Sequence, residues 1–298
     1  MKGWLAVNEF VRTPKFRDLF GLLEKAAEDK GIALTRMTNA GIFRILGETG
    51  YDLERLPAGE RPDFVLFWDK DIRLARALEA QGLRLFNRAG AIEVCDDKSL
   101  TFLALTGKGI RMPKTWLSPK KFHADGLFSE ELIAAAEEDL GYPLVVKECL
   151  GSFGAQVYLV HDREELLDRV RMIGDRPYLL QEYIASSAGR DIRIQVVGEK
   201  IAAAMLRRNP SDFRANLTNG GYAQPYTPGD AEAQMALQAV KLLGLDFAGV
   251  DILFGDEGEP ILCEVNSNAH FRNLYDCTGI NTADFIMEHI YDEMVAGI

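Results

Sequence analysis

The sequence has few residues that form disulfides or soft metal sites. Its 298 residues include four cysteines and four histidines. The cysteines lie far apart and lack the spacing of zinc ligands, so we expect free, buried thiols rather than disulfides or zinc. They are Cys95, Cys149, Cys263 and Cys277.

Long hydrophobic runs are also missing. No apolar stretch approaches the roughly 18 residues that span a bilayer. Polar Asn8 and Glu9 interrupt the first apolar segment, so the N-terminus is typical of a strand rather than a signal peptide. These absences predict a soluble cytoplasmic protein that has no membrane partner.

Positive charge is in deficit. The chain carries 34 Lys and Arg residues against 45 Asp and Glu residues, for a net charge of -11. Such a chain repels polyanions, which argues against broad binding to nucleic acid or anionic membranes. An anionic substrate must therefore be bound by a local group of basic residues.

Residues 1–95 alternate between strand-like and helix-like patterns. Apolar strands are expected at residues 4–7, 64–68 and 83–86, with helical periodicity between them. This order predicts an α/β domain with a parallel sheet, whose ligands bind beyond the carboxyl ends of the strands. Taken singly, polar residues at these ends are more often ordinary surface residues. Those in this sequence are Asn8, Glu9, Asp69 and Lys70.

Two further regions are expected at residues 96–184 and 185–298. In the first, Ser129 can cap a helix that ends at Leu140, and Asp162 with Glu165 forms a capping box for the next helix. The strands and helices expected in the two regions are strands 144–147, 157–160, 178–184, 192–197 and 201–206, and helices 230–243 and 284–294.

An acidic hairpin is the most informative feature of the chain. Asp251 and the Glu264–Asn266 segment lie on two apolar stretches, separated by the turn-rich residues 255–260. Carboxylate and amide oxygens without His or Cys favour Mg²⁺, which usually binds through one or two carboxylates and the phosphates of a nucleotide. The predicted ligands are Asp251, Glu264 and Asn266.

A glycine-containing loop could bind those phosphates. It joins two strands, follows Lys147, and offers backbone amides through its small residues Gly151, Ser152 and Gly154. The lysine precedes the glycines and no helix follows at once, so this is not a Walker A loop. By itself, a plain hairpin turn is an equally good interpretation.

Polar residues recur in order after this loop. Glu182 ends an apolar strand suited to contact adenine and ribose, whereas a solvated edge strand is the alternative. Arginines occur in the following segments, and the planar guanidinium group can donate two parallel hydrogen bonds to phosphate or carboxylate oxygens. The residues in this series are Asp191, Arg193, Arg207, Arg208, Arg214 and Asn216.

The ordered set from Asp96 to Met294 resembles the ATP-grasp superfamily and, within it, the RimK-like α-L-glutamate ligases. The resemblance rests on residues 181–184, 189–193, 207–208, 213–216, 249–253 and 264–266. It implies an α/β fold of the ATP-grasp α+β type: a pre-ATP-grasp parallel-sheet lobe (1–95), a central lobe (96–184) and a C-terminal lobe (185–298) that clamp ATP.

The resemblance also implies roles for individual residues. Lys98 and Lys147 would bind ATP phosphates, while Glu182, Tyr183 and Ile184 would line the adenosine pocket. Asp191, Arg214 and Asn216 would complete the nucleotide site. Asp251, Glu264 and Asn266 would hold two Mg²⁺ ions, for which Mn²⁺ could substitute, with Glu264 bridging them.

The segment after Asn266 departs from the ribosomal-protein glutamate ligase. It is more similar to the carrier-protein ligases of lysine biosynthesis (LysX), with a Phe, a basic residue and an Asn at corresponding places. Arg272 and Asn273 are candidates for binding a substrate carboxylate, or Phe271 packs in the core and its neighbours cap a helix. His270 is one candidate for the general base, and Asp69 is another.

The predicted activity is ATP-dependent carboxylate–amine ligation. A carboxylate attacks the γ-phosphate, and an amine then displaces phosphate from the acyl phosphate, with Arg207, Arg208 and Arg214 stabilising charge. The expected partners are a small-molecule, peptide or protein acceptor and an amino acid such as glutamate, and a homodimer or homotetramer is expected. The alternatives are another ATP-grasp ligase of amino-acid or coenzyme biosynthesis and a non-catalytic ATP-binding regulatory protein.

Overall fold

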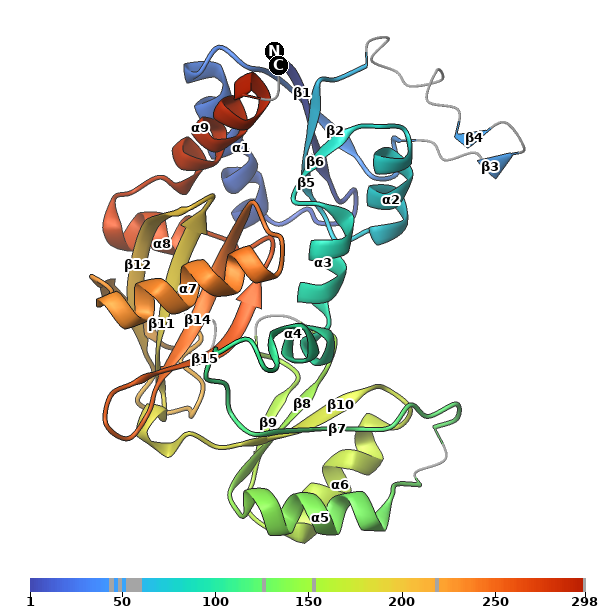
Figure 1. Ribbon diagram of the computed structural model, residues 1–298, viewed down its shortest axis with the longest axis vertical. Helices are drawn as coiled ribbons and strands as arrows, with labels where there is room; N and C mark the ends of the chain where they lie inside the picture. The colour runs from blue at the N-terminus through green and yellow to red at the C-terminus, as the bar shows by residue number, and fades with distance from the viewer. Residues whose placement is uncertain are drawn as a thin grey trace.

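The described part of the computed structural model contains three larger sheets, each with its own helices, and one two-stranded pair (Figure 1). The structure describes residues 1–42, 46–47, 50–51, 61–124, 127–151, 154–217 and 220–296. Ser152, a predicted member of the glycine-containing loop, lies outside them. In the described part of the chain, no helix is both long enough and apolar enough to cross a membrane.

The N-terminal lobe contains a four-stranded parallel sheet in the order β2-β1-β5-β6. Alternate residues of β1 point to opposite faces: Leu5 and Val7 pack with helix α1, whereas Trp4 and Ala6 pack with helix α2. Because helices cover both faces, the inner strands β1 and β5 are buried apolar runs, as predicted, whereas the edge strand β2 is partly exposed and was not predicted. The elements are β1 (Lys2–Val7), α1 (Pro14–Asp29), β2 (Ala33–Thr38), β5 (Phe64–Trp68), α2 (Ile72–Ala80), β6 (Arg84–Phe86) and α3 (Ala89–Asp96), with the short pair β3 (Leu46–Gly47) and β4 (Gly50–Tyr51).

The central lobe is an antiparallel sheet in the order β7-β10-β8-β9, covered by two helices. Ser129 and Asp162 cap these helices by accepting the N–H groups of Leu132 and Glu165 at 3.2 and 2.9 Å. The elements are α4 (Lys98–Leu105), β7 (Thr115–Leu117), α5 (Glu130–Leu140), β8 (Leu144–Glu148), β9 (Val157–Val160), α6 (Arg163–Ile173) and β10 (Tyr178–Glu182).

One detail of the predicted capping is wrong. The Glu165 carboxylate accepts the N–H of His161 at 2.8 Å, not that of Asp162. In a capping box, the Glu165 side chain would accept the N–H of the N-cap residue Asp162. Here it accepts the N–H of the preceding residue instead, because the His161 amide faces Glu165.

The C-terminal lobe is a five-stranded antiparallel sheet in the order β13-β12-β11-β14-β15. Its buried face packs on helix α7, and Figure 1 shows α8 on the other side of β12. The elements are η1 (Ala185–Ser187), β11 (Arg190–Val197), β12 (Lys200–Arg208), β13 (Tyr222–Pro225), α7 (Asp230–Leu242), β14 (Phe247–Phe254), β15 (Pro260–Asn266), α8 (Arg272–Thr278) and α9 (Thr282–Ala296).

The N-terminal and C-terminal lobes share one hydrophobic core. Helix α9 packs against α1, and the Trp68 ring stacks on Phe247 with ring centroids 5.4 Å apart. The fully buried Asn87 side chain donates to the carbonyls of Phe247 and Ser267, both at 2.9 Å, and accepts the N–H groups of Asp246 and Phe247 at 2.6 and 3.1 Å. These contacts fix the two lobes on either side of a common cavity.

Candidate active site

Two adjoining cavities lie between the lobes. The smaller cavity, of about 120 Å³, lies between the central and C-terminal sheets, and the larger cavity, of about 380 Å³, lies between the N-terminal and C-terminal lobes. Residues from the glycine-containing loop, β12, β15 and the following loops line both cavities. The shared residues are Gly151, Gly154, Arg207, Asn216 and Glu264.

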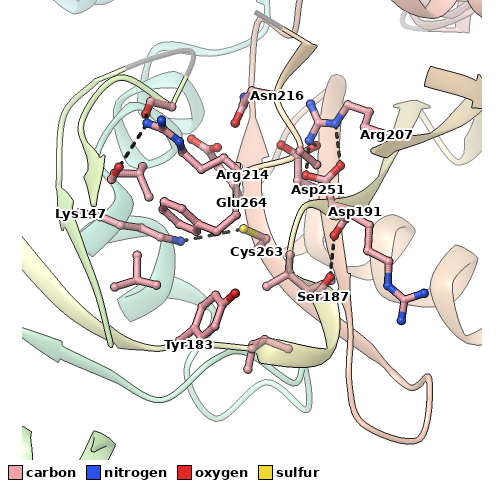
Figure 2. A pocket seen from close by; sticks show the side chains of 18 of the residues that line it. Lys147, Tyr183, Ser187, Asp191, Arg207, Arg214, Asn216, Asp251, Cys263 and Glu264 are labelled. Atoms are coloured by element: carbon pink, nitrogen blue, oxygen red, sulfur yellow. Dashed lines mark hydrogen bonds and ion pairs between the residues drawn. The ribbon is translucent and has the colours of Figure 1, made fainter. Parts of the chain in front are cut away.

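Almost the whole predicted nucleotide set lines the smaller cavity. Figure 2 shows Lys147 on one side and Asp191, Arg207 and Asp251 on the other. The predicted residues found there are Lys98, Lys147, Gly151, Gly154, Glu182, Tyr183, Ile184, Asp191, Arg207, Arg214, Asn216, Asp251 and Glu264. Arg208 lines neither cavity, because it follows Arg207 on β12 and strand neighbours point to opposite faces.

The acidic hairpin brings the three predicted metal ligands together. Asp251 on β14 pairs with Glu264 on β15, and the ladder bulges directly after Asp251. Asn266 lies two residues after Glu264, so both side chains leave the same face of β15. The Asn266 amide nitrogen is buried and has no hydrogen-bond partner among the described residues. Three oxygen-bearing side chains on one face fit a hard divalent cation.

The fit depends on Asn266. No group of three or more His, Cys, Asp and Glu side chains that could hold a metal ion occurs among the described residues. Two carboxylates and one amide supply only part of the coordination of a divalent cation. This is typical of Mg²⁺ sites in which nucleotide phosphates supply further oxygen ligands.

Asp251 belongs to a buried ion-pair network. Arg193 binds it through two nitrogens, with Nη2 2.7 Å from Oδ2, and the Arg207 Nη2 lies 3.0 Å from Oδ1. Arg207 also forms a bidentate pair with Asp191, with both contacts at 2.6 Å. Burial by itself raises the pKa of Asp251, but the charges of Arg193 and Arg207 outweigh it and lower that pKa. Asp251 therefore remains ionised, as a metal ligand must.

The lysines and the glycine-containing loop approach the same point from the central lobe. Lys98 Nζ lies 3.7 Å from Glu264 Oε1 and 3.3 Å from the carbonyl oxygen of Gly151. Lys147 Nζ lies 3.9 Å from the Cys263 sulfur. Burial raises the pKa of Cys263 to about 11, so this thiol is protonated at neutral pH and does not form an ion pair with Lys147.

Gly154 allows close contact between the loop and two predicted phosphate-site residues. Its φ is +72°, and a Cβ placed there would lie 2.8 Å from Asn216 Oδ1. Arg214 Nη1 donates to the Gly154 carbonyl oxygen at 2.6 Å. Only glycine fits this backbone without displacing Asn216.

The end of the smaller cavity that was predicted to hold adenosine is less polar. Tyr183 packs edge-on against Phe213 with ring centroids 6.3 Å apart, and Ile184 completes the wall. The Glu182 side chain is exposed and accepts the N–H of Lys114 at 3.0 Å. This hydrogen bond orients the Glu182 carboxylate, which lines the smaller cavity.

The larger cavity collects most of the predicted substrate residues, namely Asn8, Asp69, Lys70, His270 and Asn273. Asp69 accepts the side-chain N–H of Asn8 at 3.1 Å and the Lys70 N–H at 2.7 Å. Burial raises the pKa of Asp69 above its ordinary value.

Two residues after β15 are not arranged as predicted. Arg272 does not line the larger cavity, because it begins α8 and pairs with Asp276 at 2.8 Å. Phe271 is buried in the core, as the alternative for this segment predicted, but no side chain caps the start of α8.

His270 is held by the backbone at both ring nitrogens. Nε2 lies 3.1 Å from the carbonyl oxygen of Lys15, and Nδ1 accepts the Arg272 N–H at 3.4 Å. Burial and then the positive charge of Lys15 lower the pKa of His270 to about 4. These contacts favour a structural role over that of a general base.

Several residues that line the larger cavity were not assigned to a substrate site from the sequence. Among them, Lys15 lies at the start of α1, Asn268 donates to the Asp69 carbonyl oxygen at 3.0 Å, and Arg193 comes from β11. The sequence signalled only Arg193, through its alternation with Asp191. Lys15 and Asn268 reach the site because the two outer lobes share a core.

The chain is similar to several known ligases. A family model described as "RimK-like ATP-grasp domain" matches residues 95–290. N-acetylaspartylglutamate synthase A of Mus musculus is 34% identical over 299 residues, which cover 96% of this chain and 77% of that protein. A probable α-L-glutamate ligase of Shewanella sp. (strain W3-18-1) is 36% identical over 75% of this chain and 72% of its own length.

A solved structure shows the same architecture. The RimK domain ATP-grasp protein of Sphaerobacter thermophilus superposes with a TM-score of 0.71 and 21% identity, over 97% of this chain and 99% of that one. At that identity the match supports the fold alone.

Proposed function

Because the chain belongs to the RimK-like ATP-grasp family and is an ATP-dependent carboxylate–amine ligase, we propose that it joins glutamate, or a closely related amino acid, to a carboxylic acid acceptor. The two relatives named above both carry glutamate in their names, which supports glutamate as the amine. The cytoplasmic location and the dimer or tetramer expected from the sequence stay predictions.

The observation that carries this proposal is the wall shared by the two cavities. Glu264, Arg207 and Asn216 line the smaller cavity, where the polyphosphate would lie, and also the larger one. A carboxylate in the larger cavity can therefore reach the terminal phosphate without crossing solvent. Such proximity is the main contribution that a protein makes to phosphoryl transfer.

The proposed reaction has two displacements. A carboxylate oxygen of the acid attacks the γ-phosphorus, and the bond between that phosphorus and the β–γ bridging oxygen breaks to release ADP. The amine nitrogen then attacks the acyl carbon, the bond to the phosphate oxygen breaks, and the amine loses a proton. The products are an amide, ADP and inorganic phosphate.

The basic residues around the smaller cavity would offset charge during the first displacement. Lys98 and Lys147 would bind phosphate oxygens from the central lobe, and Arg214 would bind from the C-terminal lobe. Arg207 is held by Asp191 and Asp251, so it would act from a fixed position. The glycine-containing loop would exclude the water that hydrolyses an acyl phosphate.

Asp251, Glu264 and Asn266 would hold the divalent cation, two Mg²⁺ ions by the resemblance, with Mn²⁺ as a substitute. The cation supplies neutralisation of the developing phosphate charge. Asp69, whose pKa burial raises, is the proposed acceptor of the proton that the amine loses.

Product analysis tests the proposal. Incubation with Mg²⁺-ATP, glutamate and a panel of carboxylic acids should give ADP and a new adduct, one water lighter than its two components, detected by mass spectrometry. Two outcomes would remove the proposal and favour a nucleotide-binding regulatory protein. One is a rate of ADP formation that does not depend on the acid or on glutamate, and the other is no ADP formation with any combination of acid and glutamate.

A further inference from the structure

Arg214 lines the smaller cavity with most of its hydrogen bonds already made. Its Nη1 donates to two carbonyl oxygens of the central lobe, that of Gly154 at 2.6 Å and that of Val157 at 3.3 Å. Its Nε and Nη2 donate to the two carboxylate oxygens of Asp212, at 3.0 and 2.7 Å. Because a guanidinium has five N–H donors, these four contacts within the described residues leave one N–H of Nη2 for a ligand.

The Asp212 carboxylate is held by the backbone as well as by the arginine. Its Oδ1 accepts the backbone N–H of Arg214 at 2.8 Å in addition to the Nε–H. The hydrogen bond from the Arg214 side chain lowers the pKa of Asp212 below its ordinary value, so the carboxylate is ionised at neutral pH. The ion pair therefore has a fixed geometry rather than that of two loose surface charges.

The loop that carries Asp212 is anchored on the C-terminal sheet through Gly189, the residue directly before β11. The Gly189 N–H donates to the Phe213 carbonyl oxygen at 2.8 Å, and its own carbonyl oxygen accepts the Asn209 N–H at 2.7 Å. The φ of Gly189 is +63°, and a Cβ there would lie 2.2 Å from the Asn209 carbonyl oxygen and 2.9 Å from that of Asp212. Only glycine allows this approach, so the sheet itself sets the position of Asp212.

An acidic partner is unexpected on an arginine that meets a polyphosphate. The negative charge of Asp212 offsets that of Arg214 and so weakens the attraction of the arginine for phosphate. What the carboxylate gains is orientation, because a bidentate contact fixes the plane of the guanidinium. Groups that are oriented in advance toward the charge of a transition state accelerate phosphoryl transfer more than groups that have to reorient.

We propose that Asp212 is a positioning residue for phosphoryl transfer, which holds the guanidinium of Arg214 in the orientation that stabilises the terminal phosphate in the transition state. Asp212 lines neither cavity, so it acts only through Arg214. The inference rests on the proposed function for the first displacement and adds a residue to it. Asp191 holds Arg207 in a similar way, so each of these two cavity arginines has its own carboxylate.

A comparison of ADP formation with ADP binding in the full-length Asp212→Asn variant tests the inference. The change keeps the size of the side chain and removes its charge. We expect the rate of ADP formation at saturating Mg²⁺-ATP to fall at least tenfold, both with the acid that supports it best and with water as the only acceptor. The affinity for Mg²⁺-ADP, measured by calorimetric titration, should stay within threefold or become tighter, because a negative charge near the phosphates is lost.

This separation distinguishes orientation from a merely structural role. Phe213, Arg214 and Asn216 lie on the same loop and line the smaller cavity, so a disrupted loop would weaken ADP binding together with the rate. Ser211→Ala is the matched control. Ser211 lies beside Asp212, lines neither cavity and donates to Asn209 Oδ1 at 3.0 Å, and its variant should keep both the rate and the affinity within twofold.

A double-mutant cycle shows whether Asp212 acts through Arg214. Arg214→Gln should lower the rate by itself, and adding Asp212→Asn to it should change the rate less than twofold further. Three results would overturn the inference: a fall of less than tenfold in Asp212→Asn, an equal weakening of ADP binding, or additive effects in the double variant.

The two proposals fail separately. An adduct that forms with an amine other than glutamate removes the proposed function, whereas the effect of Asp212→Asn on ADP formation is measured without glutamate. Ligation of glutamate at the original rate in Asp212→Asn keeps the proposed function and removes the inference.

Discussion

Asp251 and Glu264 face each other across the β14–β15 hairpin, but their surroundings differ. The Asp251 side chain is 6% exposed and bound by two arginines. The Glu264 side chain is 32% exposed, and its ion-pair partner is Lys98 at 3.7 Å. Asp251 therefore contributes to both folding and the proposed metal site, whereas Glu264 contributes mainly to the site.

We predict that Glu264→Gln separates catalysis from stability. The change keeps the shape of the side chain but removes the charge shared by both cavities, so ligase turnover should fall by about 100-fold or more. The midpoint of thermal unfolding should stay within about 2 °C of the original, because the ion pair with Lys98 is long and Lys98 keeps its hydrogen bond to the Gly151 carbonyl oxygen. A variant that keeps its turnover, or that unfolds much earlier, would refute this role.

Asp251→Asn should damage both properties. It leaves Arg193 and Arg207 with one buried carboxylate instead of two, and such a break costs roughly 3 kcal/mol of unfolding free energy. Urea unfolding of this variant and of Glu264→Gln, measured in parallel, provides the comparison. Equal stability of the two variants would show that the arginine network contributes little to folding.

The two adjacent arginines of β12 should behave differently. Arg207→Lys loses the bidentate contact with Asp191 and should reduce turnover at least tenfold. Arg208→Ala should change turnover less than twofold and stability by about 0.5 kcal/mol at most, because Arg208 lines neither cavity. Steady-state kinetics of both variants checks this, and a larger loss in Arg208→Ala would reverse the assignment.

Asn87→Ala should weaken the contact between the outer lobes. It removes four hydrogen bonds to the backbone at the start of β14 and after β15, and leaves buried N–H and C=O groups unpaired. We expect a loss of roughly 3 kcal/mol in denaturant unfolding. Arg76→Ala, which removes an exposed ion pair with Glu93, is the control and should have little effect. Similar losses in the two variants would contradict a structural role for Asn87.

His270 should affect the pH dependence of stability rather than that of catalysis. Its pKa is about 4 in the folded protein, against 6.5 for the ordinary side chain. The unfolded chain therefore takes up a proton as the pH falls below about 6.5, the folded protein does so only near 4, and stability declines across this window. The His270→Gln variant lacks this titrating group, so its free energy of unfolding does not decline from this cause. The difference in unfolding free energy between the variant and the original protein should therefore shrink as the pH falls from 6.5 to 4.

Urea midpoints at several pH values measure this convergence, and parallel curves would refute it. The pH profile of turnover should keep its shape in His270→Gln, since neither ring nitrogen is available as a base. Loss of one limb of that profile would return His270 to the catalytic candidates.

Local pattern was enough to predict the hairpin and the common face of its three proposed ligands. Glu264 and Asn266 differ by two positions on an apolar strand, and a turn separates them from Asp251, so their common face follows from strand geometry. The parallel N-terminal sheet was predictable from its inner strands β1 and β5, which are buried and apolar, whereas its edge strand β2 has mixed polarity and was missed.

Contacts set by strand register were not predictable. Arg193 faces Asp251 only because β11 and β14 pair in one particular register. The strand β13 was missed because it is short, largely exposed and ends at Pro225. Lys15 reaches the larger cavity through the packing of α1 against α8 and α9, which no local pattern reveals.

Transfer of isotope from the acid to phosphate tests the central claim most directly. An acid substrate labelled with ¹⁸O in its carboxylates should give one labelled oxygen in the inorganic phosphate for each amide formed, because the attacking carboxylate oxygen leaves with the phosphate. Phosphate without label, or label in AMP, would contradict an acyl phosphate formed at the wall that the two cavities share.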